Sequence, residues 1–167
     1  MKISSLVART MMVGIASALI VGSASAQKKP INISLVTPIQ IFSAETAISG
    51  VRWNILYGRN NSMSGLDFGL VNHVSGSMTG VQLGGVNLVE SMSGWQDGVV
   101  NYSEGELEGF QSGGVNYAGR INGLQLGVVN YAERANGVQI GLINIIKEGG
   151  FLPVMIIANW GFEQARQ

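Results

Sequence analysis

The feature of this chain that most constrains its fold is a motif of eight residues that recurs every fourteen or fifteen residues. The stretch 123–144 contains it twice, as GLQLGVVN and then as GVQIGLIN. A short, fixed period is typical of proteins in which each repeat is one structural unit stacked on the next. The leading glycine of the motif occurs seven times, at Gly50, Gly65, Gly80, Gly94, Gly109, Gly123 and Gly137.

The residues after each leading glycine alternate between apolar and polar, as in Leu124, Gln125 and Leu126. This period of two predicts a β-strand with one buried face. A second glycine and two consecutive apolar residues then break the alternation, so we expect the strand to bend there. Small polar residues before the leading glycine, as in Asn122-Gly123, are typical of turns.

The two polar columns of the motif are dominated by side-chain amides. If equivalent residues stack, amides of successive repeats can hydrogen-bond to one another in ladders, as in cross-β assemblies. We therefore expect structural ladders in both columns. Their members are Gln82, Gln96, Gln111, Gln125 and Gln139, and Asn72, Asn87, Asn101, Asn116, Asn130 and Asn144.

These patterns predict an all-β protein built from short repeats, for which two architectures are open. In a β-solenoid each repeat is one coil and equivalent residues stack about 4.8 Å apart. In an antiparallel meander each repeat is one strand, and the meander can close into a small β-barrel. The solenoid is favoured because a meander would need the same turn at both ends. Asp97 and Ser112 count against it, since a thin core tolerates unpartnered polar groups poorly.

Residues 1–26 have the three parts of a secretory signal peptide. Lys2 and Arg9 supply the basic start, residues 11–21 the apolar run and residues 24–26 an Ala-Ser-Ala cleavage site. The run is too short to span a bilayer as a helix, which takes about 20 residues. We therefore expect export and cleavage. The remaining chain divides into an N-terminal capping region at 27–49, a seven-unit array at 50–148, and a capping strand with a tail at 149–167.

Composition limits the classes of function. The chain has no cysteine, so it forms no disulfide and no cysteine-linked lipid anchor. Without Lys2 and Arg9, eight of its ten basic residues remain against ten acidic ones. Nucleic-acid binders carry clustered basic charge, so we expect no nucleic-acid partner. The 12% of charged residues is about half the usual share, which indicates a chain that faces something less polar than water or buries most of itself.

Candidates for catalysis or metal binding are few. His73 is the single histidine, in a column that elsewhere contains leucine and tyrosine, whereas a metal site needs several converging ligands. Glu104, Glu106 and Glu108 lack the spacing of known calcium loops, so we interpret them as an exposed acidic turn. We therefore predict no catalytic residue, no cofactor and no metal site, and a protein that is not an enzyme.

Two sets of aromatic residues occupy regular positions. Trp53, Phe68, Trp95 and Phe110 lie in the apolar columns next to the glutamine column, and we predict that they are core because aliphatic residues replace them elsewhere. A second set is expected at the surface, as an interface or as a belt at a membrane boundary. It consists of Tyr102, Tyr117 and Tyr131.

The repeats at 80–144, the segment SGVRWNILYG at 49–58, GLDFGLVNH at 65–73 and the closing FLPVMIIANWGF at 151–162 resemble the exported bacterial surface-repeat proteins. This resemblance implies export and a repeat architecture, but no activity. The sequence thus predicts a structural or binding scaffold in the periplasm, in the outer membrane or on the cell surface. Its partner would be an unidentified protein, glycan or envelope component, with possible outer-membrane association. The alternative is a small outer-membrane β-barrel protein.

Overall fold

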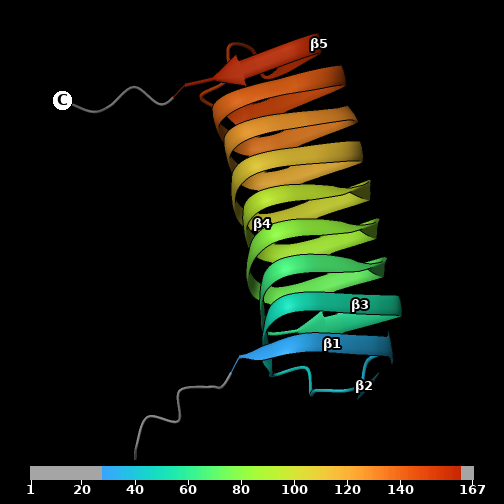
Figure 1. Cartoon of the computed structure of the whole chain (residues 1–167). Coiled ribbons are helices and arrows are strands. Elements are labelled where there is room, and N and C mark those ends of the chain that lie inside the picture. The colour runs from blue at the N-terminus through green and yellow to red at the C-terminus, as the bar shows by residue number, and fades with distance from the viewer. Residues whose placement is uncertain (1–27, 163–167) are drawn as a thin grey trace, which may run out of the picture.

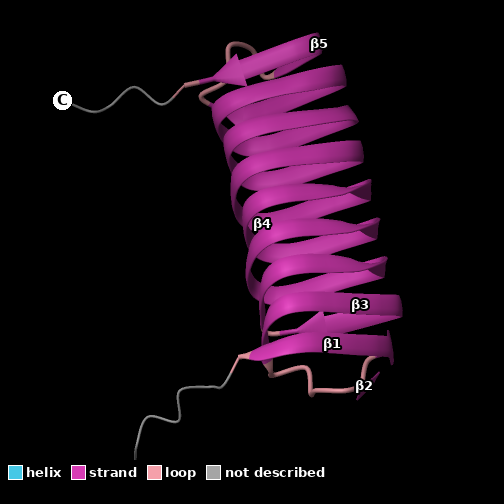
Figure 2. Cartoon of the chain, in the orientation of Figure 1, coloured by secondary structure: helices cyan, strands magenta, loops and turns pink. Residues whose placement is uncertain are grey.

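A computed structural model describes residues 28–162, so the predicted signal peptide and residues 163–167 of the tail lie outside the described chain. Figure 1 shows a rod of stacked coils with a different segment at each end. Figure 2 shows that almost the whole rod is strand. The elements are β1 (Lys29–Val36), β2 (Ile39–Gln40), β3 (Ala47–Asn60), β4 (Ser62–Glu148) and β5 (Val154–Gly161).

The coils pair in parallel, one repeat apart. Gly50 of β3 pairs with Gly65 of β4, and Trp53 pairs with Phe68. Farther along β4 the stacking continues, because a Cβ atom added to Gly109 would lie 2.3 Å from the carbonyl oxygen of Gly94. One repeat therefore forms one coil, which confirms the predicted β-solenoid. The antiparallel meander is wrong for these residues, and so is the barrel that it would close.

The leading glycines are required by both conformation and space. Six of them, from Gly50 to Gly123, have φ between 121° and 149°, a region that residues with a Cβ rarely adopt. At Gly123 an added Cβ would lie 2.0 Å from the carbonyl oxygen of Gly109. Backbone carbonyls cannot move away within the ladder, so this corner accepts only glycine.

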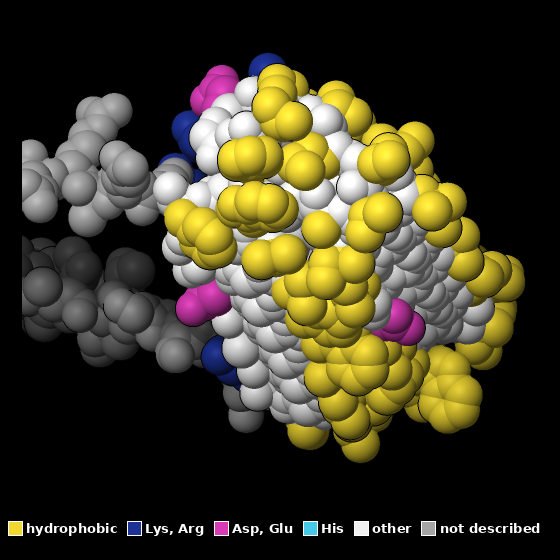
Figure 3. Space-filling model, turned by 90° about the horizontal axis from the view of Figure 1, so that it is seen from above, with side chains coloured by type: hydrophobic (Ala, Val, Ile, Leu, Met, Phe, Trp, Pro, Cys, Tyr) yellow, Lys and Arg dark blue, Asp and Glu magenta, His cyan; other side chains and the backbone are white. Residues whose placement is uncertain are grey.

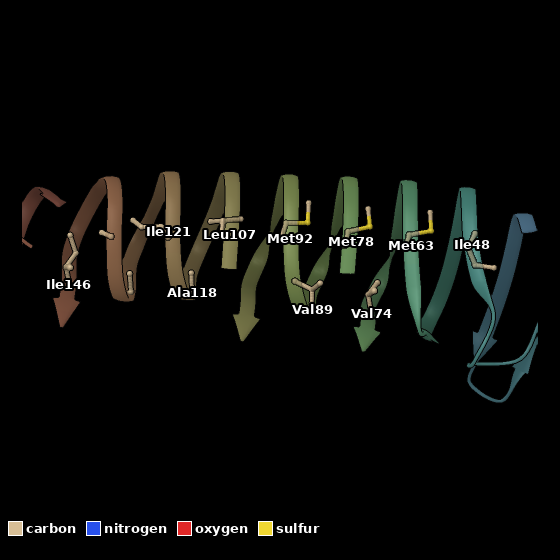
Figure 4. Close-up of a cluster of buried hydrophobic side chains, with 12 residues drawn as sticks. Ile48, Met63, Val74, Met78, Val89, Met92, Leu107, Ala118, Ile121 and Ile146 are labelled. Carbon is tan, nitrogen blue, oxygen red and sulfur yellow. The ribbon is translucent and has the colours of Figure 1, made fainter. Parts of the chain in front are cut away.

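The interior of the rod is narrow and contains both amides and aliphatic side chains. Each coil directs its glutamine-column and asparagine-column residues inward, and these are fully buried. The remaining interior is aliphatic, and Figure 4 shows these side chains stacked from coil to coil along the rod. They are Ile48, Met63, Val74, Met78, Val89, Met92, Leu107, Ala118, Ile121, Ala132, Ala135 and Ile146.

Each coil turns a corner where two successive side chains face outward. Val99 is exposed and Val100 half-buried, and the next residue, Asn101, is fully buried. This break in the alternation lies beside the second glycine, where the sequence predicts a bend. It divides the outer surface of the motif into two adjoining sides.

Both ends of the rod are covered by strands that depart from the motif. At the N-terminal end β1 pairs in parallel with β3, and β2 folds back antiparallel to β1. Phe42 packs against the buried aliphatic side chains there. At the other end β5 pairs antiparallel with the last coil, with Ile157 at a φ of 73°. Among residues 28–162 there is no helix, and hence none long and apolar enough to cross a membrane.

Candidate binding surface

The asparagine column forms a continuous ladder inside the rod. The Nδ2 atom of Asn87 donates to Oδ1 of Asn101 at 2.8 Å, and that of Asn101 donates to Asn116 at 2.9 Å. Asn101 also donates to the backbone carbonyl of Ser112 at 2.7 Å. Both N–H groups of such an amide are therefore satisfied, which is what makes a fully buried amide tolerable.

The glutamine column forms a second ladder of opposite direction. The Nε2 atom of Gln111 donates to Oε1 of Gln96, and that of Gln125 donates to Gln111, both at 2.7 Å. Donors thus point toward the N-terminal end, whereas in the asparagine ladder they point toward the C-terminal end. Each ladder leaves a buried acceptor without a partner at its end, Oδ1 of Asn54 and Oε1 of Gln139.

The glutamine ladder ends in a buried ion pair at its N-terminal end. Nη2 of Arg52 lies 2.7 Å from Oδ2 of Asp67, and both side chains are fully buried. Asp67 also accepts from Nε2 of Gln82 at 2.9 Å and from Nδ2 of Asn54 at 3.1 Å. In the sequence, Arg52 and Asp67 stand at the glutamine position of the first two repeats. Because they share this column with five glutamines, the sequence already indicated that they would join the same ladder.

The first member of the asparagine ladder was not predicted from the sequence. Asn54 pairs in register with Gly69 at the second-glycine position, while Gly58 pairs with Asn72. The two residue types are thus exchanged in the first coil. The Asn54 side chain fills the asparagine column and donates to Asn72 at 2.7 Å, in space where a Cβ on Gly58 would lie 1.7 Å from Oδ1 of Asn54.

The prediction that Trp53, Phe68, Trp95 and Phe110 form the core is wrong. Trp53 is 62% and Trp95 42% exposed, and the two phenylalanines are half-buried. In a strand, neighbours point to opposite faces, so burying the amide column turns the flanking apolar residues outward. Periodicity identified the two faces but not which one is inside.

Asp97 and Ser112 are likewise on the outer surface and do not disturb the interior. Ser112 Oγ donates to a carboxylate oxygen of Asp97. The indole Nε1 of Trp95 donates to Ser112 Oγ at 3.0 Å. The objection that these two residues raised against a solenoid therefore disappears, because each has a partner outside the core.

We call the outward residues at the first, third, fifth and sixth positions after each leading glycine the apolar flank. They are aliphatic, aromatic or glycine in every coil, apart from Asp97 and Ser112. Figure 3 shows hydrophobic side chains gathered over the rod, with the visible Lys and Arg side chains along one margin. The most exposed members include Trp53, Ile55, Leu66, Leu70, Val99, Val128, Ile140 and Leu142.

The apolar flank continues over both ends of the rod. In β1, Ile31 and Ile33 pair with Val51 and Trp53. In β5, Trp160 pairs with Val138, and Ile156 of the same strand is 73% exposed. The capping strands therefore close the hydrogen bonding of the rod without interrupting its apolar surface.

The tyrosine column lies along one border of the apolar flank. The rings of Tyr102 and Tyr117 stack with centroids 4.6 Å apart, and those of Tyr117 and Tyr131 are 5.1 Å apart. Oη of Tyr117 donates to Glu133 at 3.4 Å. Burial, the charge of Glu133 and the neighbouring tyrosines raise the pKa of Tyr117. The column thus joins the apolar flank to charged groups.

Beyond the tyrosines, the last third of the repeats from Gly80 onward bears most of the exposed charges of β4, and we call this strip the charged edge. The predicted acidic turn is exposed there. Nowhere in the described coils do three metal-ligating side chains converge. The charged edge consists of Glu90, Glu104, Glu106, Glu108, Arg120, Glu133, Arg134, Lys147 and Glu148.

His73 borders an open hollow of about 340 Å³, which also contacts Arg59, Glu90, Tyr102 and Glu104. The hollow lies where the tyrosine column contains Leu88. Nδ1 of His73 is 2.8 Å from Oη of Tyr57. Burial, and next the charges of Arg59 and Arg52, lower the pKa of His73. These surroundings therefore favour the neutral imidazole over its charged form.

The structure separates the candidate residues predicted from the sequence. The glutamine and asparagine ladders are interior, whereas the tyrosines are on the outer surface beside the apolar flank. No family model matches the chain, and no curated protein or solved structure matches it. The surface that can meet a partner is thus defined by the apolar flank, the tyrosine column and the charged edge.

Proposed function

We propose that this chain is an exported, non-enzymatic protein of the bacterial cell envelope, related to the surface-repeat proteins. It acts in the periplasm, at the outer membrane or on the cell surface as a structural or binding scaffold. The observation that carries the proposal is the apolar flank, which extends over every coil and both caps. Exposed apolar patches beyond a few hundred Å² are rare on monomers and mark interaction surfaces.

The ladders explain how such a flank is kept regular. Each amide is hydrogen-bonded to a neighbouring coil, as in the donation from Gln125 to Gln111 at 2.7 Å and from Asn116 to Asn130 at 2.8 Å. Fixed inward residues hold the outward residues at the constant spacing of the coils. A rigid rod with one apolar surface is suited to holding a partner along its length.

The polar groups support a scaffold more than an enzyme. Arg52 and Asp67 neutralise each other inside the rod, and the amides are occupied by the ladders. The imidazole of His73 lies beside the Tyr57 hydroxyl and near two arginines. The charged edge is open to solvent, where charges are screened.

Fractionation of bacteria that express residues 1–167 with a C-terminal tag tests this proposal. We expect the tagged protein in the periplasmic or outer-membrane fraction, shortened by the mass of residues 1–26. A matched Ala24→Arg/Ala26→Arg variant should keep the full mass, because the cleavage site needs small residues. Full-length parent protein in the cytoplasm would contradict the proposal.

A further inference from the structure

We propose that the apolar flank binds the surface of a lipid bilayer, with its side chains among the acyl chains and the charged edge in water. This inference rests on the proposed envelope scaffold and names its partner. The rod would lie along the membrane and would not cross it. Four features of the described residues carry the argument.

The first feature is the separation of charge from the flank. At the flank positions of the repeats, Asp97 is the one ionisable side chain. It accepts a hydrogen bond from Ser112 at the surface. The other exposed charges of β4 belong to the charged edge. Such separation, with a strongly polar face opposite an apolar one, is the pattern of segments that lie in a membrane interface.

The second feature is the hydrogen bonding of the backbone. Hydrocarbon cannot satisfy an exposed N–H or C=O group, which limits the backbone that can enter it. In the solenoid these groups pair along the rod with the coils on either side, as between β3 and β4. Between the caps the flank therefore presents side chains without unpaired strand edges.

The third feature is the tyrosine column at the border of the flank. Tyrosine is enriched where a protein meets the headgroup layer, because its ring is apolar and its hydroxyl is polar. The rings of Tyr102, Tyr117 and Tyr131 form one stacked row. At Tyr117 the hydroxyl points toward Glu133 of the charged edge. This row marks the depth to which the rod is immersed.

The fourth feature is the shape of the flank, which favours lipid over a second copy of the chain. The flank turns the corner at Val99 and Val100, so that its last position lies on the adjoining side together with the tyrosine column. A second rod packed on one side would leave the other side in water. Acyl chains conform to both sides at once, and so bury the whole apolar surface.

The charge of the edge determines which lipid the flank requires. The edge contains six glutamates, Glu90, Glu104, Glu106, Glu108, Glu133 and Glu148, against the three basic residues Arg120, Arg134 and Lys147. An acidic edge gains nothing from anionic headgroups. We therefore expect binding to uncharged phosphatidylcholine vesicles, with little dependence on salt.

The experiment is flotation of the purified chain, without residues 1–26, with phosphatidylcholine vesicles, with and without phosphatidylglycerol. Tryptophan fluorescence gives a second readout, because all three tryptophans, Trp53, Trp95 and Trp160, are on the flank. Phosphatidylcholine with brominated acyl chains should quench them. We expect flotation and quenching in both lipid mixtures.

Two flank variants and one matched control locate the contact. Val99→Glu and Leu142→Glu add a carboxylate at positions that are 68% exposed, so the fold should be kept. Each should weaken partitioning about tenfold or more, because one buried aliphatic side chain contributes about 1.5–3 kcal/mol. Ser77→Glu adds the same charge outside the flank and should float like the parent.

Three results would overturn the inference. The first is a parent that does not float or is not quenched, and the second is a Ser77→Glu control that loses binding as strongly as the flank variants. The third is a stable dimer in sedimentation that Val99→Glu dissociates. The dimer would assign the flank to a second copy. If the protein is still found in the envelope fraction, any of these results leaves the proposed scaffold standing, whereas a cytoplasmic location removes the scaffold itself.

Discussion

The interior of the coils contains buried amides, whereas the apolar flank exposes aliphatic side chains to the outside. This is the reverse of the arrangement in an ordinary globular protein. Gln111 and Asn101 are fully buried, whereas Val99 and Leu142 are each 68% exposed. Ordinary cores exclude amides because a buried amide without a partner costs more than a buried methyl group gains. The solenoid removes that cost, since each coil supplies the partner for the next.

Stacking, and not the hydrophobic effect alone, determines what the interior of this rod can hold. A buried amide in one coil meets the same amide in the next at hydrogen-bond distance, as at Asn116 and Asn130. The outward side has no such requirement within the chain. Its apolar residues are therefore selected by whatever lies outside the rod.

The largest effect is expected at an inward-facing glycine, compared with a glycine of the charged edge. In Gly113→Ala the new Cβ points inward and would lie 1.8 Å from the carbonyl oxygen of Gly98, which is fixed in the ladder. In the matched Gly105→Ala the nearest atom, a carbonyl oxygen of Glu90, is 3.1 Å away. We expect Gly113→Ala to cost about 4 kcal/mol or more in unfolding free energy, or to prevent folding. Circular dichroism during urea unfolding measures both variants, and equal midpoints would contradict the contrast.

The next largest effect concerns the buried ion pair. Arg52→Met leaves Asp67 inside the rod without its cation, and we expect a loss of about 3–5 kcal/mol in unfolding free energy. The double variant Arg52→Gln/Asp67→Gln extends the glutamine ladder by two members and should recover most of that loss. Urea unfolding of both variants and the parent is the measurement. A double variant as unstable as Arg52→Met would show that the column requires charge, and not only hydrogen bonds.

A smaller effect is expected within the asparagine ladder. Asn101→Leu leaves the Nδ2 atom of Asn87 and the Oδ1 atom of Asn116 without their ladder partners. We expect a loss of about 2–4 kcal/mol, since each unpaired buried group costs about 1–3 kcal/mol. The reverse change on the flank, Val99→Asn, should alter stability by less than about 0.5 kcal/mol. Similar losses in the two variants would mean that the flank is part of the core after all.

The repeat, its period and its strand character were all predictable from the sequence, because a fixed spacing of glycine and amide columns leaves few ways to stack. The choice of the solenoid was also confirmed. The side of the strand that faces inward was predicted wrongly. Alternation describes two faces equally well, and the assumption that Trp53 and Trp95 belong inside came from ordinary cores.

Details of the first coil could not be predicted by aligning columns. Asn54 reaches the asparagine ladder from a glycine position, which depends on the bulge that shifts the register between Asn54 and Tyr57. A register shift of this kind is set by local backbone geometry, and the repeat pattern does not indicate it. The apolar flank could be identified only from the structure, which shows that both ladders lie in the interior of the rod.

The smallest expected effect concerns His73, the residue that replaces tyrosine beside the charged edge. Burial and two arginines lower its pKa, so below pH 6.5 the unfolded chain binds a proton that the folded chain does not. Its contribution to stability is full above pH 6.5 and is lost as the pH falls toward the folded pKa. His73→Tyr, which extends the tyrosine column, should remove that part of the pH dependence. Unfolding midpoints of both proteins between pH 7.5 and pH 5 measure the difference, because carboxylates that titrate in this range affect both equally. Parallel midpoint curves would mean that the imidazole is as well solvated in the folded chain as in the unfolded one, and that this end of the border is open to water.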